Sequence, residues 1–221
     1  MMDRPQEVSQ ELRADLENLR RLNSYFGSYR LIRSYLRRWC KPGQDIVLID
    51  LCTGFGDIPR FIVSWCRAAG VAIRIIAVDS QPSTLQIARE HSATYPEIEY
   101  ESADIFEFQE TADLVFCSLA LHHFSELDAM KILRQIDAMA RRGALIADLE
   151  RTDLGILGID LLTALAFREL MTRFDARLSI RRSFSFQEME LLATEAGWRS
   201  FEHRRFPVCR QAIAKYKVSQ E

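Results

Sequence analysis

Apolar and polar positions along residues 45–150 alternate between two periods. Short runs rich in β-branched residues, typical of strands buried on both faces, are separated by segments whose apolar residues recur at helical intervals. Strands are predicted at residues 46–49, 72–78, 98–101, 114–117 and 144–147, and helices at residues 58–69, 82–91 and 125–140. Because strands and helices alternate, the sheet is expected to be parallel.

The segments on either side of this region follow other patterns. Residues 7–40 carry apolar positions at helical intervals, interrupted at residues 27–28, and so predict two helices with a bend between them. After Arg151 the alternation stops, and residues 154–171 predict one apolar helical insertion that ends near residues 174–175. This insertion follows the fifth strand, at the edge of the sheet where the strands end.

The end of the chain predicts a helix and two further strands. Ser185 and Glu188 have the spacing of a capping box at the start of a helix over residues 185–196. Residues 198–205 and 211–217 predict strands whose connection is too short for a parallel crossover, so they are expected to pair antiparallel. The expected fold class is therefore α/β, with a seven-stranded, mostly parallel sheet and an antiparallel last strand.

The length of the chain and the changes in its apolar pattern together predict how it is divided into domains. Residues 1–44 are expected to form an N-terminal helical cap, and residues 45–221 one α/β domain with a helical lid insertion at about residues 152–182. A chain of 221 residues fits one main domain, since most domains have about 50–250 residues.

Composition narrows the classes of partner and location. With 29 Lys+Arg against 31 Asp+Glu, the net charge of −2 argues against a sequence-independent nucleic-acid binder. No stretch reaches the roughly 20 apolar residues of a membrane span, and the chain start lacks the regions of a secretory signal. A cytoplasmic location is expected, with the five cysteines reduced. Their spacing matches no metal-binding pattern, so no metal site is predicted.

Candidate binding residues gather at the ends of the predicted strands. Asp50 closes the first strand, and Gly54 and Gly56 follow it, which allows a sharp turn and the close approach of a ligand. Asp79 and Asp104 follow the next two strands. Because the carboxyl ends of parallel strands line one crevice, the three carboxylates are expected to converge there. A carboxylate in this place can accept hydrogen bonds from both hydroxyls of a ribose.

Two ligand classes fit such a crevice. Asp79 lies 23 positions beyond Gly56, near the interval of a dinucleotide fingerprint, but the third glycine of that fingerprint is absent. Asp57 would repel a pyrophosphate at the helix start, and Asp50 would suit a cationic group. The pattern favours a nucleoside that carries a positive charge, and an NAD(P)-dependent oxidoreductase is the alternative.

The motifs in this order resemble those of class I S-adenosylmethionine-dependent methyltransferases. The resemblance covers about residues 45–150, continues in the closing strands, and rests on residues 50–56, Asp79, residues 103–104 and residues 113–124. It implies a Rossmann-like methyltransferase fold, S-adenosyl-L-methionine (SAM) as cofactor and S-adenosyl-L-homocysteine (SAH) as product.

The resemblance also implies which residues bind the cofactor. The implied set is a loop of Asp50, Cys52, Thr53, Gly54 and Gly56, then Asp79 with Ser80 at the ribose, Asp104 and Ile105 at the adenine, and Ser118 and Leu119 on the methionine side. Cys52 stands where the family usually has its first glycine, and a small side chain is expected to be tolerated there if φ is negative.

Methyl transfer from a sulfonium is an in-line displacement, so the protein mainly aligns the reactants and excludes water. A base is needed only where the acceptor must lose a proton. His122 and His123 follow the fourth strand and are the candidate catalytic residues. Their alternative role is to start and pack the helix that follows.

The apolar insertion suggests what is methylated. By resemblance it builds the acceptor pocket, and its lining predicts a small hydrophobic acceptor, phenolic or quinone-like, as in methyltransferases of polyketide-type natural products. The alternatives for this helix are ordinary core packing or a homodimer contact. A nucleoside-binding module without turnover is the remaining alternative for the whole chain.

Overall fold

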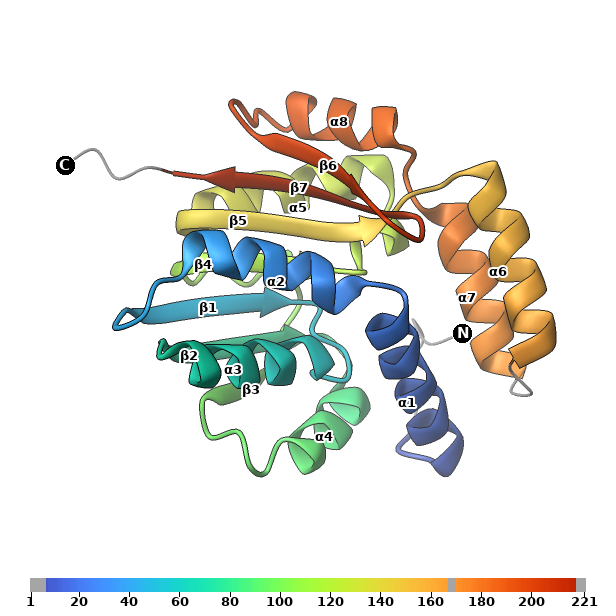
Figure 1. Ribbon diagram of the computed structural model, residues 1–221, viewed down its shortest axis with the longest axis horizontal. Helices are drawn as coiled ribbons and strands as arrows, with labels where there is room; N and C mark the ends of the chain where they lie inside the picture. Colours follow the sequence, from blue (N-terminus) through green and yellow to red (C-terminus); the bar gives the residue numbers. More distant parts are fainter. Residues whose placement is uncertain (1–6, 167–169, 218–221) are drawn as a thin grey trace.

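The computed structural model describes residues 7–166 and 170–217, and a seven-stranded sheet runs through the middle of this part (Figure 1). The strands are β1 Asp45–Leu51, β2 Ala72–Asp79, β3 Ile98–Ser102, β4 Ala112–Ser118, β5 Ala140–Leu149, β6 Glu202–Phe206 and β7 Arg210–Tyr216. Their order is β3-β2-β1-β4-β5-β7-β6, and β7 is antiparallel to both neighbours. The predicted fold class is confirmed, and the strand order reverses between β1 and β4.

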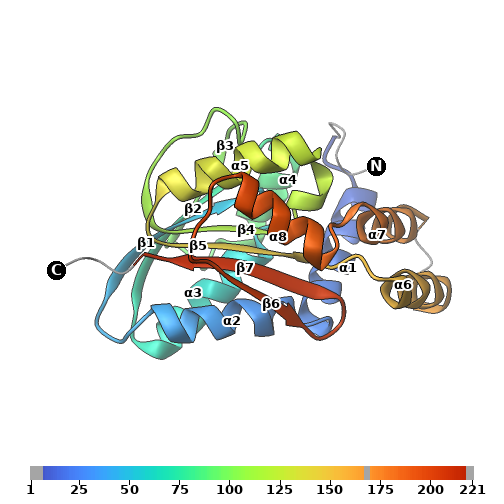
Figure 2. The same cartoon turned by 90° about the horizontal axis from the view of Figure 1, so that it is seen from above.

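Helices cover both faces of the sheet (Figure 2). On one face lie α2 Ser28–Trp39 and α3 Asp57–Ala69, and on the other α5 Glu126–Met139 and α8 Phe186–Glu195. The helix α4 Pro82–His91 connects β2 to β3. The inner side of α2 is fully buried against β1, β4 and β5, so this helix is part of the main core.

Three helices stand at the carboxyl ends of the strands. These are α1 Gln10–Tyr25 and a hairpin made of α6 Asp153–Ala166 and α7 Leu170–Arg182 (Figure 1). The short 3-10 helix η1 Leu121–His123 follows β4 at the same end. Because the sheet order reverses here, these helices face the crevice in which α/β proteins bind their ligands.

The prediction of one helix over residues 154–171 is wrong. The segment forms two antiparallel helices, and the second continues to Arg182 rather than ending near residues 174–175. Asp160 joins them through ion pairs with Arg177, at 3.3 Å, and Arg181, at 2.5 Å. Both helices carry apolar residues at helical intervals, so periodicity alone does not separate them.

The predicted helix cap is confirmed, whereas one strand begins later than predicted. Ser185 and Glu188 form a capping box at the start of α8. β6 starts at residue 202 instead of 198, because Trp198 is buried and its indole N–H donates to the Leu133 carbonyl at 2.9 Å. This anchor ties the start of the segment to α5 rather than to the sheet.

No helix in the described ranges is long and apolar enough to cross a membrane.

Candidate functional site

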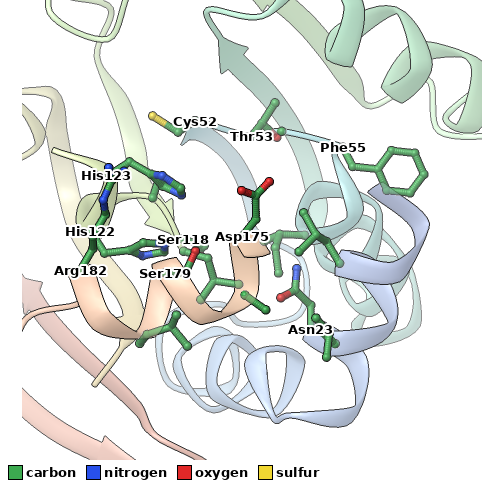
Figure 3. A pocket seen from close by; sticks show the side chains of 18 of the residues that line it. Asn23, Cys52, Thr53, Phe55, Ser118, His122, His123, Asp175, Ser179 and Arg182 are labelled. Atoms are coloured by element: carbon green, nitrogen blue, oxygen red, sulfur yellow. The ribbon is translucent and has the colours of Figure 1, made fainter. Parts of the chain in front are cut away.

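A cavity of about 810 Å³ opens at the carboxyl ends of β1, β2 and β4 (Figure 3). Its walls come from the loops that follow these strands, from the inner face of α1, from α6 and α7, and from the turn between β6 and β7. The cavity therefore lies where the strand order reverses.

The turn after β1 is a left-handed bend held by backbone hydrogen bonds. Thr53 N donates to Val78 O at 2.9 Å, and Gly56 N donates to Thr53 O at 3.0 Å. Gly54 has φ +53° and lines the cavity, and a Cβ added there would meet nothing within 4 Å. Gly54 is thus the position at which a ligand can approach the backbone.

Gly56 has a different reason to be glycine. Its φ is +69°, and a Cβ there would overlap with the ring and hydroxyl of Tyr100. That hydroxyl is hydrogen-bonded to Ser92 Oγ at 2.8 Å. Among the described residues that line the cavity Gly56 does not appear, so its lack of a side chain makes room for Tyr100.

The condition under which a side chain was expected to be tolerated at Cys52, a negative φ, is not met. Its φ is +55°, so a non-glycine residue occupies the left-handed region at the position where glycine was expected. The side chain packs beside the core, lines the cavity and contacts Cys117. A left-handed backbone costs an L-residue about 1–2 kcal/mol, which the surrounding structure must offset.

The structure brings the three predicted acids to this one cavity. Asp79 accepts hydrogen bonds from the backbone N–H of Gly54, at 2.8 Å, and of Gln81, at 2.9 Å, and so ties the β2 end to the glycine turn. Asp104 is exposed at the rim and accepts from Phe106 N at 2.9 Å, and Ile105 beside it is buried.

Asp50 is the most deeply placed of the three acids. Its side chain is 2% exposed, and its Oδ2 accepts a hydrogen bond from Thr53 Oγ1 at 2.7 Å. Burial raises the pKa of Asp50 to about 7 against the hydrogen bond from Thr53, and the charges of Asp57 and Asp79 add to the rise. A cation in the cavity would reverse this effect by favouring the carboxylate.

His122 and Asp148 form a buried pair between η1 and the end of β5. The ring Nδ1 lies 2.6 Å from Asp148 Oδ1, and the backbone N of His122 donates to Oδ2 at 3.0 Å. Burial, the largest influence, would raise the pKa of Asp148, but the charge and hydrogen bonds of His122 hold it below its ordinary value. An ionised carboxylate accepts from Nδ1–H, and in the neutral form of the ring Nε2 is then the acceptor.

Three buried polar atoms in the cavity wall have no hydrogen-bond partner within the described part of the chain. They are Asp50 Oδ1, Ser118 Oγ and His122 Nε2. Buried polar groups are nearly always hydrogen-bonded, and the exceptions call for an explanation. A ligand with donor groups that fills the cavity would satisfy all three.

The remaining predicted residues lie in the same wall. Ser80, Leu119 and His123 line the cavity, and the rings of His122 and His123 lie 4.2 Å apart (Figure 3). Leu119 has φ +57°, and its N–H donates to Ala147 O at 2.7 Å. Every predicted site residue except Gly56 therefore contributes to one cavity.

The decisive comparison concerns the segment that carries these residues. Residues 48–143 match a family model described as a methyltransferase domain. These residues have the sequence of a methyltransferase domain. The predicted resemblance to class I SAM-dependent methyltransferases is thereby confirmed.

This methyltransferase domain is similar to a curated protein over part of its length. A 2-phytyl-1,4-naphtoquinone methyltransferase of Thermosynechococcus vestitus is 33% identical over 79 residues, which make up 36% of this chain. The match spans about a third of the length of that curated relative, 34%.

Solved structures share the fold over most of the chain. Human N-acetylserotonin methyltransferase in complex with SAM has a TM-score of 0.67 and 18% identity, over 95% of this chain and 56% of that one. The plantazolicin methyltransferase in complex with a monoazolic desmethylPZN analog and SAH has a TM-score of 0.71 and 14% identity, over 95% of this chain and 90% of that one. At these identities the likeness establishes the fold of the methyltransferase domain.

Sequence reasoning missed several residues of the cavity of this methyltransferase domain. Asn23, Asp175, Ser179 and Arg210 line it from α1, α7 and β7 (Asn23, Asp175 and Ser179 are labelled in Figure 3). They come from distant parts of the chain and carry no motif. For the part of the wall formed by α1, the apolar face of this helix was the one sequence signal that could have predicted it.

Asp57, which was expected to repel a pyrophosphate, lines the cavity and also connects helices. Its Oδ2 accepts hydrogen bonds from Asn23 Nδ2, at 3.1 Å, and from the Tyr29 hydroxyl, at 3.0 Å. Tyr29 also stacks on Phe61 of α3, with ring centroids 4.6 Å apart. The start of α3 thus contacts both N-terminal helices, α1 and α2.

Proposed function

We propose that this chain binds SAM in the cavity and transfers its methyl group to a small hydrophobic acceptor held beneath α1, α6 and α7. One observation carries the proposal: a single cavity joins the acid-lined glycine turn to an apolar wall, with three unsatisfied buried polar atoms between them. A donor and an acceptor can be held in contact in such a space.

The residues around the glycine turn fit the donor. Asp79 would hold the ribose hydroxyls, with Ser80 beside it, and Asp104 with Ile105 would receive the adenine. The unpaired Oδ1 of Asp50 would accept from the ammonium group of the methionine part, since a cation restores the charged form of this carboxyl. SAM supplies an activated methyl group on a sulfonium when it is bound.

The methionine end would meet Cys52, Thr53, Gly54, Ser118 and Leu119. Gly54 leaves open space for the ligand backbone to approach the turn, and Ser118 Oγ lacks a partner. Gly56 would act indirectly, since its contact with Tyr100 fixes the shape of the turn. The set matches the residues that the resemblance implied.

His122 is the better candidate for a base than His123. Its Nδ1 is fixed by Asp148, so the free electron pair lies on Nε2, which has no partner in the described structure. A positioned base contributes typically about 10²–10⁴-fold to a proton transfer. Asp148 is a positioning residue in this scheme, because it acts only through the ring of His122.

The acceptor is proposed to be phenolic or quinone-like. Support comes from the leucine-rich wall made by α1 and the hairpin α6–α7, and from the relative whose name specifies a naphthoquinone. An NAD(P)-dependent oxidoreductase has no support from the comparisons, since the family model and both curated relatives name methyltransferases. A binding module without turnover would also bind SAH, so only the measurement of methyl transfer described below distinguishes it from the proposal.

Two measurements test the proposal. Calorimetry with SAH should detect binding to the wild-type chain, and Asp79→Ala should weaken it by about 100-fold or more, because hydrogen bonds to a charged group contribute about 1.5–3 kcal/mol each. The control Asp45→Ala removes an exposed acid from the opposite end of β1 and should leave SAH affinity unchanged.

The second measurement is methyl transfer itself. Incubation with SAM and a set of phenols and hydroquinones should give products heavier by one methyl group, detected by mass spectrometry. Failure to bind SAH would contradict the proposal as a whole. Binding without any methylated product would favour the module without turnover.

We also propose that the chain acts in the cytoplasm. All five cysteines are free thiols, and burial raises the pKa of Cys40 to about 11 and that of Cys66 to about 12, which keeps both protonated and unreactive. Cell fractionation followed by immunoblotting would test the location.

A further inference from the structure

The acceptor side of the cavity contains a buried arginine that the proposed reaction does not use. Arg210 is the first residue of β7 and pairs in register with Leu149 at the end of β5. Its side chain lines the cavity, yet only 5% of the residue is exposed. Removing a charge from water is costly unless a partner compensates it, so a buried guanidinium needs an explanation.

The described structure gives Arg210 little compensation. Its side chain makes one hydrogen bond, a long one of 3.4 Å from Nε to the carbonyl of Phe26, and no ion pair. The charge of Asp148 favours the cationic form, but both oxygens of that carboxylate already accept hydrogen bonds from His122, and Oδ1 also accepts from Leu149 N. Arg210 therefore lines the cavity without an ion pair among the described residues.

The backbone before Arg210 holds it firmly in this place. Val208 and Cys209 form the turn between β6 and β7, and both have positive φ, +63° and +51°. Both also line the cavity, and the Cys209 carbonyl accepts from Glu150 N at 2.9 Å. The turn thus presents three consecutive residues to the cavity on a backbone that is tied to the end of β5.

Arg210 lies beside Ser118 and Leu119, with which it lines a small side pocket, and it is further from the three acids of the glycine turn. In the sheet, β7 is two strands beyond β4, whereas the three acids of the glycine turn follow β1, β2 and β3. Phe26, Gly155 and Val208 also line the cavity, and the Phe26 carbonyl accepts the one hydrogen bond of the Arg210 side chain. A planar fork of N–H donors without an ion pair matches a carboxylate, which it can bind through two parallel hydrogen bonds.

We propose that Arg210 binds a carboxylate of the acceptor, so that the substrate is a hydrophobic, aromatic carboxylic acid. This inference rests on the proposed function, since it assigns Arg210 to the acceptor of that reaction. The carboxylate end of the acceptor lies at β7, and the group that receives the methyl lies toward His122 and the end of β4. Arg210 thereby selects the substrate and fixes its orientation.

The experiment compares matched ligands on matched variants. Benzoate, naphthoate and hydroxynaphthoate are each titrated against the corresponding carboxamide, with and without SAH, by calorimetry. The wild-type chain should prefer at least one carboxylate over its amide by roughly 10- to 100-fold, the range expected of a hydrogen-bonded charge. Arg210→Met should remove this preference, and Arg210→Lys should retain part of it.

The control is Arg37→Met, which makes the same chemical change at an exposed position of α2. It should bind every ligand as the wild type does. If Arg210→Met does not fold, the wild-type preference and its reduction in Arg210→Lys decide the question. A wild-type chain that binds no carboxylate, or binds acids and amides equally, would overturn the inference.

A second arm asks whether the anion is instead the carboxylate of the donor. SAH and methylthioadenosine, which lacks the amino-acid end, are titrated into the wild type and Arg210→Met. The inference expects the same SAH affinity in both proteins. A loss of SAH affinity in Arg210→Met with methylthioadenosine unaffected would assign Arg210 to the donor and overturn the inference. Because SAH binding is scored separately, a failure of the proposed function is recognised independently.

Discussion

The two walls of the cavity are built in different ways. The donor wall, defined here as the cavity residues at and after the ends of β1, β2 and β3, carries the three acids and comes from a short stretch of chain, residues 50–106. The acceptor wall, defined as the cavity residues of α1, η1, α6, α7 and β7, is largely apolar and draws on residues 16–210. The first wall is positioned by the sheet, and the second by the packing of helices around it.

The contacts within the walls differ accordingly. In the donor wall, Asp79 is fixed by two backbone N–H groups and Thr53 N is bonded to the β2 end. The hairpin of the acceptor wall is joined by ion pairs of Asp160 whose side chains are roughly a third to two-fifths exposed. Exposed ion pairs contribute about 0–1 kcal/mol, so the acceptor wall can change in sequence at little cost in stability.

The largest expected effect separates chemistry from donor binding. His122→Gln should lower kcat for a hydroxyl acceptor by about 10²–10⁴-fold, because glutamine cannot take the proton that Nε2 would accept. SAH affinity should stay at the wild-type value, since His122 belongs to the acceptor wall. Initial rates of SAH formation and calorimetry give the two numbers.

The neighbouring histidine provides the matched control. His123→Gln should retain most of kcat, and Asp148→Asn should lower it while leaving SAH binding intact, because the ring of His122 loses its fixed orientation. Equal losses in His122→Gln and His123→Gln would contradict the assignment of the base. A loss of SAH affinity in His122→Gln would break the separation of the two walls.

The next effect lies within the donor wall and compares its two glycines. Gly56→Ala should lower the free energy of unfolding by about 2–4 kcal/mol, through its left-handed φ and the overlap with Tyr100. Gly54→Ala should lower it by only about 1–2 kcal/mol, because its new Cβ meets open space, but it should weaken SAH binding. Urea denaturation measures the stability of each variant, and calorimetry measures its affinity for SAH. Equal stabilities of Gly56→Ala and Gly54→Ala would show that the contact with Tyr100 is unimportant.

The smallest effect concerns the protonation of Asp50, whose pKa is raised to about 7 chiefly by burial. In the ligand-free chain the folded state holds a proton that the unfolded state releases near pH 4, so stability falls as pH rises from about 4 to 7. A cationic ligand favours the carboxylate, so SAM binding below pH 7 should release a proton. The affinity for SAM should therefore increase by up to about tenfold for each unit by which the pH rises toward 7.

Calorimetry in two buffers of different ionisation enthalpy measures this proton. Asp50→Asn should bind SAM more weakly and with no such pH dependence. An affinity of the wild-type chain that is constant between pH 5 and 7 would show that Asp50 does not meet the cationic part of the ligand.

The same contrast explains how much the sequence could predict. Asp50, Asp79 and Asp104 follow successive strands, and parallel strands place their ends together, so the donor wall follows from the alternating pattern. The capping box at Ser185 was likewise visible, since it depends on residues three positions apart. Local spacing and sheet topology together were sufficient to predict the donor wall and the start of α8.

The acceptor wall could not be derived in the same way. The hairpin α6–α7 was predicted as one helix because apolar residues recur at helical intervals in both of its helices. Arg210 begins an ordinary strand in the sequence, and only the register of β7 against β5 brings it to the cavity. The bond between His122 and Asp148 joins residues 26 positions apart and also follows from tertiary packing.

One contact of the acceptor wall joins the beginning of the chain to its end. The hydrogen bond from Arg210 to the carbonyl of Phe26 bridges 184 positions in the sequence. The corner proposed to hold the substrate thus lies between the end of α1 and the start of β7, and it forms only when both are present. Substitutions on its two sides are therefore expected to co-vary, so specificity can drift at the extremities while the segment between them stays unaltered.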